Sequence, residues 1–284
     1  MFNLKKLQIT TPLIICCLFS PAAFAVDGVL EINHTCANVL GCFSGDDKGY
    51  PITIDGSAGR SYRLTSDLIV PDENTNGIEV NTSSVSIDLN GFEIVRSGCE
   101  GVTKDCKPEA GSGSGVMGDG TGTSVKNGSV TGMGWNGIDL TAHQSVVEGV
   151  RVRWNRMDGI KVSHASLVSN NNAYSNGNDG IGSGIHAITA NGNMVVGNGK
   201  NGISCGPGST ISANTAVANG NDGIRADIGS NVLNNTVSSN TGYGLFLHPE
   251  TGYRGNIITA NKTGTVFGGF NMGSNFCQTN DTCP

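Results

Sequence analysis

Charged and aromatic residues are scarce in this sequence. Of its 284 residues, 14% are Asp, Glu, Lys or Arg and 6% are Phe, Trp or Tyr. So few charges argue against a coiled coil and against a charged disordered chain. The formal net charge is −6. Because binding to nucleic acid requires clustered positive charge, we expect no nucleic-acid partner.

Long hydrophobic runs are also lacking. No segment approaches the roughly 20 apolar residues of a membrane helix. The short run 13–19 (LIICCLF) follows Lys5 and Lys6 and precedes Ala23-Phe24-Ala25, a small-x-small cleavage pattern. We therefore predict a signal peptide over residues 1–25, a secreted or periplasmic product and no membrane span. The alternative is an uncleaved N-terminal anchor.

No Cys-x-x-Cys pattern occurs, which argues against a structural zinc site. The cysteines beyond the signal peptide instead fall into close pairs, which in an exported protein predict short disulfides. Cys205 is left over, and its place in the repeat described below predicts a buried, unreactive thiol. The expected disulfides are Cys36–Cys42, Cys99–Cys106 and Cys277–Cys283.

Glycine, by contrast, is abundant, with 43 residues that lack the three-residue period of collagen. A longer period is present. A glycine followed by Ile, Val or Leu occurs at Gly115 and returns every 21 or 22 residues as far as Gly244. Two columns of asparagine keep step with these glycines. Their most regular members are Asn171, Asn193, Asn214, Asn235 and Asn256 in one column, and Asn155, Asn176, Asn198, Asn219, Asn240 and Asn261 in the other.

A repeat of this length holds three short strands and three turns. Stacked turns lie about 4.8 Å apart, so that equivalent asparagines can hydrogen-bond from one turn to the next. The sequence thus predicts an all-β, right-handed parallel β-helix of about eight rungs. Leucine-rich repeats would need a Leu-x-x-Leu-x-Leu frame, and calcium-binding nonapeptide repeats would need Gly-Gly-x-Gly-x-Asp; both are missing.

The ends of such a solenoid need caps. We assign residues 26–55 to an N-terminal cap, 56–263 to the repeats and 264–284 to a C-terminal cap. The interval between Gly77 and Gly115 is longer than one repeat, and its excess, 96–114, is predicted to be an inserted loop held by Cys99 and Cys106.

Residues 62–94 (YRLTSDLIVPDENTNGIEVNTSSVSIDLNGFEI) and rungs such as 127–138 (NGSVTGMGWNGI) resemble secreted right-handed parallel β-helix proteins of the pectate-lyase-like superfamily. The resemblance extends over about 56–263. It implies the fold and, because the superfamily includes polysaccharide lyases, glycoside hydrolases, alginate epimerases, tailspikes and adhesins, a polysaccharide or cell-surface glycan as partner. It does not imply one activity.

The catalytic motifs of these relatives are absent. The Asn-Thr-Asp and Gly-His-Gly of polygalacturonases do not occur, and the one Asp-Asp, Asp46-Asp47, precedes the repeats. The Asp-Pro-His-Asp of alginate epimerases and the Arg-x-x-Lys-like region of pectate lyases are also missing. We therefore expect a secreted glycan-binding or structural protein that requires no cofactor. The alternative is a divergent polysaccharide lyase, epimerase or hydrolase.

Candidate site residues lie on the strand that follows each repeated glycine. Period-two alternation points Asp139 outward, with Lys161 one rung away, and brings Arg225, Asp227 and His248 together on two rungs. Lys161, Arg225 and His248 are the candidate catalytic residues, since a lyase needs a base and a positive group beside the uronate. Asp139 and Asp227 are candidate ligand-binding residues and could hold calcium. The competing interpretation is a solvated face with weak ion pairs.

Three further groups have less specific interpretations. Trp154 and Tyr174 are candidate platforms for sugar stacking, although packing would explain them equally well. Asp158, Asp179 and Asp222, each directly before a repeated glycine, are typical of turns, with a calcium site as the alternative. His143 and His164 occur near one corner of adjacent rungs, and we interpret them as surface histidines because a metal site needs more ligands.

Overall fold

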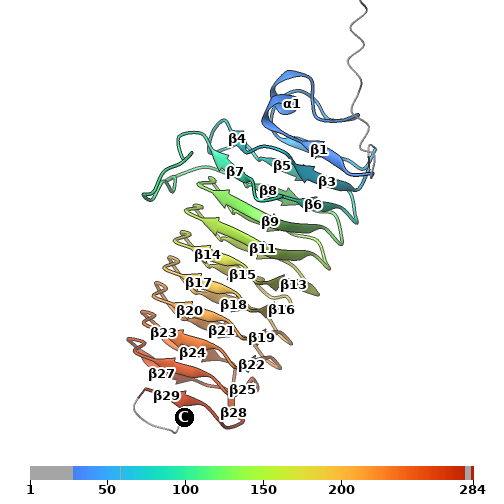
Figure 1. The fold of residues 1–284 in the computed structure, drawn as a ribbon. Coiled ribbons are helices and arrows are strands. Elements are labelled where there is room, and N and C mark those ends of the chain that lie inside the picture. Colours follow the sequence, from blue (N-terminus) through green and yellow to red (C-terminus); the bar gives the residue numbers. More distant parts are fainter. Residues whose placement is uncertain (1–27, 58, 279–282) are drawn as a thin grey trace, which may run out of the picture.

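The computed structural model describes residues 28–57, 59–278 and 283–284, so the predicted signal peptide lies outside the described residues. The chain winds into a rod of stacked turns, a parallel β-helix (Figure 1). Its single helix within these residues, α1 (His34–Val39), lies at the N-terminal end of the rod. No helix in this part of the chain has the length and hydropathy needed to cross a membrane.

One side of the rod is a ten-stranded parallel sheet. Strands β5 to β21 of this sheet each begin directly after a repeated glycine, as the period predicts. The sheet has two more strands than the eight rungs expected, because β2 and β27 extend the stack at its ends. Its strands are β2 (Ile52–Ile54), β5 (Ile78–Val80), β8 (Val116–Gly118), β10 (Ile138–Leu140), β12 (Ile160–Val162), β15 (Ile181–Gly182), β18 (Ile203–Cys205), β21 (Ile224–Ala226), β24 (Tyr243–Leu247) and β27 (Gly264–Phe267).

The remaining strands form a second sheet of 19 strands that covers the other two sides of the rod. The eight-residue strands β9 (Ser124–Thr131) and β11 (Val146–Arg153) each run along both of these sides and so join them. The other strands are β1 (Leu30–Ile32), β3 (Ser61–Leu64), β4 (Leu68–Val70), β6 (Ser86–Asp88), β7 (Glu93–Arg96), β13 (Ser166–Ser169), β14 (Asn172–Tyr174), β16 (Ile188–Asn191), β17 (Met194–Val196), β19 (Thr210–Ser212), β20 (Thr215–Val217), β22 (Asn231–Leu233), β23 (Thr236–Ser238), β25 (Gly252–Arg254), β26 (Ile257–Thr259), β28 (Phe270–Asn271) and β29 (Phe276–Cys277).

The two asparagine columns form buried ladders, as predicted. Asn176 donates through Nδ2 to Oδ1 of Asn198 at 3.0 Å, and Asn198 donates in the same way to Asn219 at 3.0 Å. Most of these amides also reach a strand carbonyl; Asn198, for example, donates to Ala173 O at 3.1 Å. Since a buried polar group must be paired, this two-way bonding explains why one residue type recurs at each corner.

The repeated glycines are required by close packing against these ladders. A Cβ atom added to Gly180 would lie 2.7 Å from Nδ2 of Asn198 and 2.7 Å from the carbonyl oxygen of Gly202. Both distances are shorter than a carbon atom tolerates. Glycine and asparagine are therefore two parts of one corner, which accounts for their shared period.

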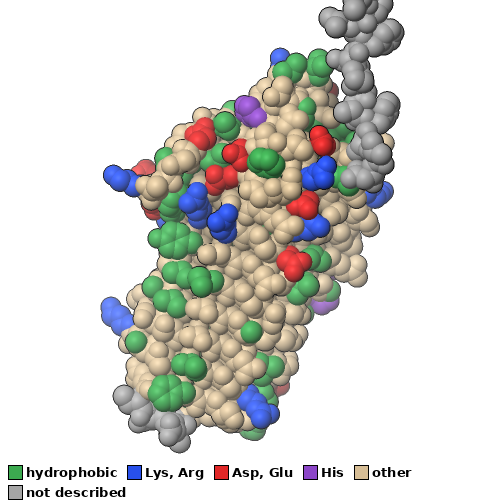
Figure 2. Space-filling view, viewed as in Figure 1, with side chains coloured by type: hydrophobic (Ala, Val, Ile, Leu, Met, Phe, Trp, Pro, Cys, Tyr) green, Lys and Arg blue, Asp and Glu red, His purple; other side chains and the backbone are tan. Residues whose placement is uncertain are grey.

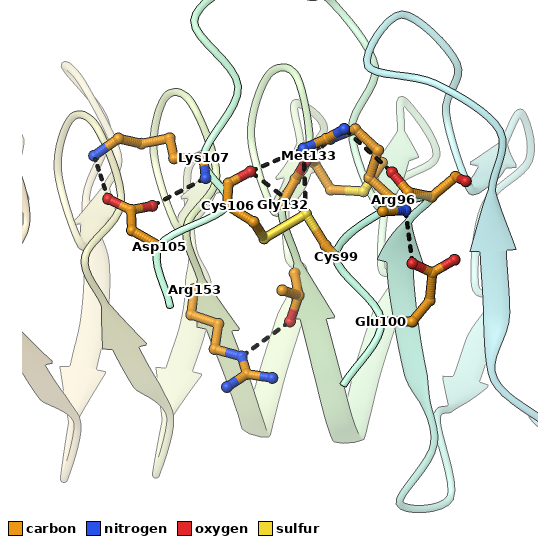
Figure 3. The surroundings of a disulfide bond; sticks show 12 residues. Arg96, Cys99, Glu100, Asp105, Cys106, Lys107, Gly132, Met133 and Arg153 are labelled. Atoms are coloured by element: carbon orange, nitrogen blue, oxygen red, sulfur yellow. Dashed lines mark hydrogen bonds and ion pairs between the residues drawn. A yellow bond between two sulfur atoms is a disulfide. The ribbon is translucent and has the colours of Figure 1, made fainter. Parts of the chain in front are cut away.

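The three expected disulfides are present: Cys36–Cys42, Cys99–Cys106 and Cys277–Cys283. Figure 3 shows the second of them, in the loop between β7 and β8. Arg96 ties this loop to Gly132, the residue after β9, because its guanidinium donates to Cys106 O and to Gly132 O, both at 2.8 Å. Three disulfides are consistent with an oxidising compartment outside the cytosol.

Candidate functional site

The middle residues of the ten-stranded sheet form one outward-facing column. Backbone register pairs Asp139 with Lys161, as expected from the sequence, and then Lys161 with Gly182. The column continues through Ser204, Arg225, Phe246 and Phe267, each on the next strand along the rod. Along the rod, the column therefore begins with a charged segment, Asp139 and Lys161. It continues with a bare segment at Gly182, which has no side chain, and ends with an aromatic segment, Phe246 and Phe267.

A groove of about 290 Å³ lies over the C-terminal half of this column. It brings together Arg225, Asp227 and His248, three of the residues selected from the sequence. We call this feature the groove, and define it by its lining residues. These are Gly184, Ser204, Cys205, Arg225, Ala226, Asp227, Phe246, Leu247, His248, Pro249 and Phe267.

An aromatic stack forms one wall of the groove. The rings of Phe246 and Phe267 are parallel to within 14°, with their centroids 4.8 Å apart, and Tyr243 lies 5.4 Å from Phe267. The guanidinium of Arg225 covers the other side, 4.4 Å from the centre of the Phe246 ring. Phe267 is 49% exposed, whereas Phe246 lies between Phe267 and the guanidinium and is half-buried, so that Phe267 offers the accessible aromatic surface.

The polar groups of the groove are held by their own backbone surroundings. Asp227 accepts the Ile228 N–H through Oδ1 at 2.7 Å. His248 accepts the Glu250 N–H through Nδ1 at 3.2 Å, so that in the neutral ring the proton is on Nε2. Asp222 forms an ion pair with Arg225, with Oδ2 4.0 Å from a guanidinium nitrogen. Burial raises the pKa of Asp222, opposed by the Tyr243 N–H bond and by Arg225.

A second cluster, the Lys161 cluster, comprises Asp139, Asp158, Lys161 and Asp179. Lys161 pairs with Asp158 at 3.4 Å and not with Asp139, its neighbour in register. Asp139 is only 7% exposed; its Oδ2 accepts from Asn136 at 2.8 Å, whereas its Oδ1 is buried without a hydrogen-bond partner. Burial raises the pKa of this carboxyl. The expectation of an accessible Asp139 ligand is therefore wrong, because its neighbours cover it.

Two carboxylates border Gly182, the bare segment beside Lys161; Asp158 is buried and Asp179 is half-buried. A Cβ atom at Gly182 would lie 3.1 Å from Oδ2 of Asp158 and 3.8 Å from Oδ2 of Asp179, so both oxygens face the place where a side chain is missing. Asp179 accepts the Asn201 backbone N–H at 2.9 Å and its Nδ2 at 3.0 Å through Oδ1. Burial, and then repulsion from Asp158, raise the pKa of Asp179 to about 6.

The two groups of candidate residues do not form one centre. Lys161 and Arg225 lie three strands apart, which at ~4.8 Å per strand is about 14 Å along the rod. They cannot both act on one sugar ring. Together, however, they line a single face from the Lys161 cluster to the groove.

The two predicted stacking platforms lie elsewhere. Trp154 is 5% exposed and lies at a corner with φ of 55°, beneath the Arg153 guanidinium at 4.6 Å. Its role as a sugar platform is wrong, since a buried ring has no face to offer. Tyr174 is 45% exposed, but it is on β14 in the other sheet. The aromatic residues that do reach the groove, Phe246 and Phe267, were not selected as site residues.

Two other features have structural explanations. Cys205 is buried, as expected, and burial raises the pKa of its thiol to about 12. Charged side chains gather over β7, β9 and β11 in the view of Figure 2. They form ion pairs such as Arg153–Glu93 at 3.3 Å and Lys126–Asp88 at 3.7 Å, so this surface has no uniform sign.

Known proteins share the architecture. Residues 114–275 match the family described as "Right handed beta helix region". The chain belongs to this family. No curated protein sequence matches the chain.

Solved structures with this fold include two modules from Azotobacter vinelandii. The A-module of mannuronan C-5 epimerase AlgE4 is 14% identical, with a TM-score of 0.55, and the match covers 84% of this chain and 70% of the module. The AlgE6 A-module is 17% identical, with a TM-score of 0.53 and coverage of 87% and 68%. The Dettilon tailspike protein gp208 is 15% identical, with a TM-score of 0.56, and the match covers 82% of this chain but 46% of the tailspike. The TM-scores show a shared fold, and at such low identities the matches show nothing beyond the fold.

Proposed function

We propose that this protein is an exported β-helix protein that binds a carbohydrate in the groove. The observation that supports this most strongly is the exposed Phe267 ring, stacked on Phe246 beside Arg225, Asp227 and His248. The apolar face of a pyranose packs on a flat aromatic surface, while its hydroxyl groups need nearby polar partners. The groove supplies both on one rigid sheet.

The composition of the groove favours a glycan over a peptide or a nucleic acid. Its walls carry an arginine, a carboxylate and an imidazole, and it lies along the outer face of the ten-stranded sheet, where an extended chain can bind. Mannuronan, on which two of the fold neighbours act by their names, is such a chain. Disulfides in all three paired positions support export, and hence access to extracellular or periplasmic glycans.

The Lys161 cluster supports a second function, a divergent polysaccharide lyase, epimerase or hydrolase. Proton transfer works best with a group whose pKa is near the working pH, and Asp179 has a raised pKa of about 6. Asp179 and Asp158 face the bare surface at Gly182, with Lys161 beside them to stabilise negative charge. In this alternative Asp179 accepts or returns the proton, Lys161 assists, and the groove holds the adjoining sugars.

No metal is part of either proposal. In the side-chain positions of this structure, no three His, Cys, Asp or Glu residues among those described are grouped as they would be around a metal ion. Calcium at Asp139 or Asp227 remains a prediction from the sequence, and adding calcium to the assays tests it.

Binding and turnover are separated by one experiment. The purified protein is offered pectate, alginate, glycosaminoglycans and neutral plant glycans, with and without calcium, and retention on each immobilised glycan is measured. The same mixtures are analysed for chain length, unsaturated ends and C-5 configuration. We expect retention on at least one glycan that is lost in Phe246→Ala. Product formation that is lost in Asp179→Asn and Lys161→Met would establish the enzyme instead, and no retention on any glycan would contradict the binding proposal.

A further inference from the structure

Three of the five histidines in the chain occupy one column of the rod, away from the groove. His143, His164 and His186 lie at the corners that precede β11, β13 and β16. Backbone register pairs Val146 with Leu167 and Ser166 with Ile188. Counting back along each strand, the three histidines take equivalent places on three successive turns.

The His143 ring lies close to the rings of both other histidines. Two turns separate the backbones of His143 and His186, or about 10 Å at ~4.8 Å per turn. Yet their ring centroids are only 6.5 Å apart, and the centroids of His143 and His164 are 5.8 Å apart. The rings of His143 and His186 therefore lean towards each other across the turn that carries His164.

The backbone at this corner is fixed while the side chains remain accessible. The carbonyl of His143 accepts the Gly122 N–H at 2.9 Å, and that of His164 accepts the Gln144 N–H at 2.9 Å. The side chains of His143 and His164 are exposed and that of His186 is half-buried. Beside them lies a hollow of about 410 Å³ that His164 helps to line. Ions in solution can thus reach all three imidazoles.

We propose that His143, His164 and His186 bind one late first-row divalent metal ion, taken as Zn²⁺, with water completing the coordination. Neutral imidazole is a preferred ligand of Zn²⁺, Cu²⁺ and Ni²⁺, whereas Ca²⁺ and Mg²⁺ prefer oxygen. Two imidazoles on a tetrahedral Zn²⁺, with Zn–N bonds of about 2.0 Å, have ring centroids about 5 Å apart.

The rings are close to this arrangement but not yet in it. Their separations of 5.8 and 6.5 Å exceed the bound spacing by roughly 1 Å, and in these side-chain positions no three His, Cys, Asp or Glu residues among those described could hold a metal ion. Binding would therefore require the three side chains, two of them exposed, to rotate towards one ion. The ion would then link three turns and bind only the folded chain, so it would also stabilise the fold.

Calorimetric titration of the purified protein with ZnCl₂ at pH 7.5 tests this site. We expect one Zn²⁺ per chain and an affinity at least tenfold weaker in each of His143→Asn, His164→Asn and His186→Asn. His34→Asn, which removes a histidine on α1, should bind Zn²⁺ like the wild type. Circular dichroism shows whether each variant keeps the β-helix.

Two results would overturn the proposal. One is the absence of Zn²⁺ binding in the wild type. The other is binding that stays within twofold of the wild type when all three histidines are replaced and the β-helix is intact, because the ion would then lie elsewhere. Neither result bears on carbohydrate binding, since the histidines lie outside the groove.

Discussion

The guanidinium of Arg225 lies 4.4 Å from the centre of the Phe246 ring, one strand away on the same face of the ten-stranded sheet. The negative face of the aromatic ring attracts the delocalised cation, and this attraction holds the guanidinium above the ring. It also fixes the arginine at the edge of the groove, where its remaining N–H groups can bind a ligand.

The aromatic stack should supply most of the binding free energy. Removing both rings in Phe246→Ala/Phe267→Ala takes away the flat apolar surface, and we expect glycan affinity to fall by at least tenfold, as for an aromatic anchor of an interface. Affinity measured by calorimetry checks this. Tyr174→Ala is the matched control, since Tyr174 is similarly exposed on the other sheet. Equal losses in the two variants would show that the groove is not the binding site.

Arg225 should contribute through its shape as well as its charge. Arg225→Ala is expected to weaken glycan binding several-fold, and Arg225→Lys to restore only part of the loss, because an ammonium group neither stacks on Phe246 nor donates two parallel hydrogen bonds. Binding measured for the three proteins at two salt concentrations separates charge from stacking. Full rescue by lysine would contradict the stacking role.

The asparagine ladder should dominate the stability of each turn. Asn198→Ala removes the acceptor of Asn176 and leaves buried N–H groups unpaired. At about 1–3 kcal/mol for each such group, we expect the free energy of unfolding to fall by about 3 kcal/mol. Denaturant titration measures it, with Asn231→Ala, an exposed asparagine on β22, expected to change it by less than about 0.5 kcal/mol. A similar small change in Asn198→Ala would mean that the ladder is not needed.

Asp179 should make stability fall as pH rises. Its pKa in the folded protein is about 6 against an ordinary value of 3.8. Between these two values the folded chain therefore keeps a proton that the unfolded chain has lost. The free energy of unfolding decreases as pH rises from about 4 to 6 and stays lower above that range. Below pH 4 both states are protonated and the full stability is present.

Asp179→Asn should remove this decrease, since Asn201 shows that an asparagine fits the same place on the next turn. We expect the variant to exceed the wild type by about 1–2 kcal/mol at pH 7 and to match it near pH 4. Thermal unfolding across this range measures the difference. Asp119→Asn, at an exposed carboxylate, is the control. A variant less stable than the wild type at pH 7 would contradict the raised pKa.

The period of the sequence predicted most of the fold because it repeats the same physical requirement on every turn. Gly180 must lack a side chain to make room for Asn198, and Asn198 must pair with Asn219. Register followed from the period, so the neighbours Asp139 and Lys161 were predicted correctly, as were the outward places of Arg225, Asp227 and His248. The count of rungs was too low because β2 and β27 lack the glycine signature.

The aromatic half of the site was missed for a different reason. Phe246 and Phe267 follow Arg225 at intervals of 21 residues, so the period already contained the signal. Phe267 had been assigned to a cap, which removed it from the column. The burial of Trp154 was not predictable, because it depends on a corner residue adopting positive φ and on the arginine that covers the ring.

The most direct measurement is the crystal structure of the protein with an oligosaccharide of whichever glycan it retains. We predict a sugar ring packed on Phe267, with a polar group of the sugar within hydrogen-bond distance of Arg225. A sugar bound on the 19-stranded sheet, or a groove left empty while the oligosaccharide is bound elsewhere, would contradict it.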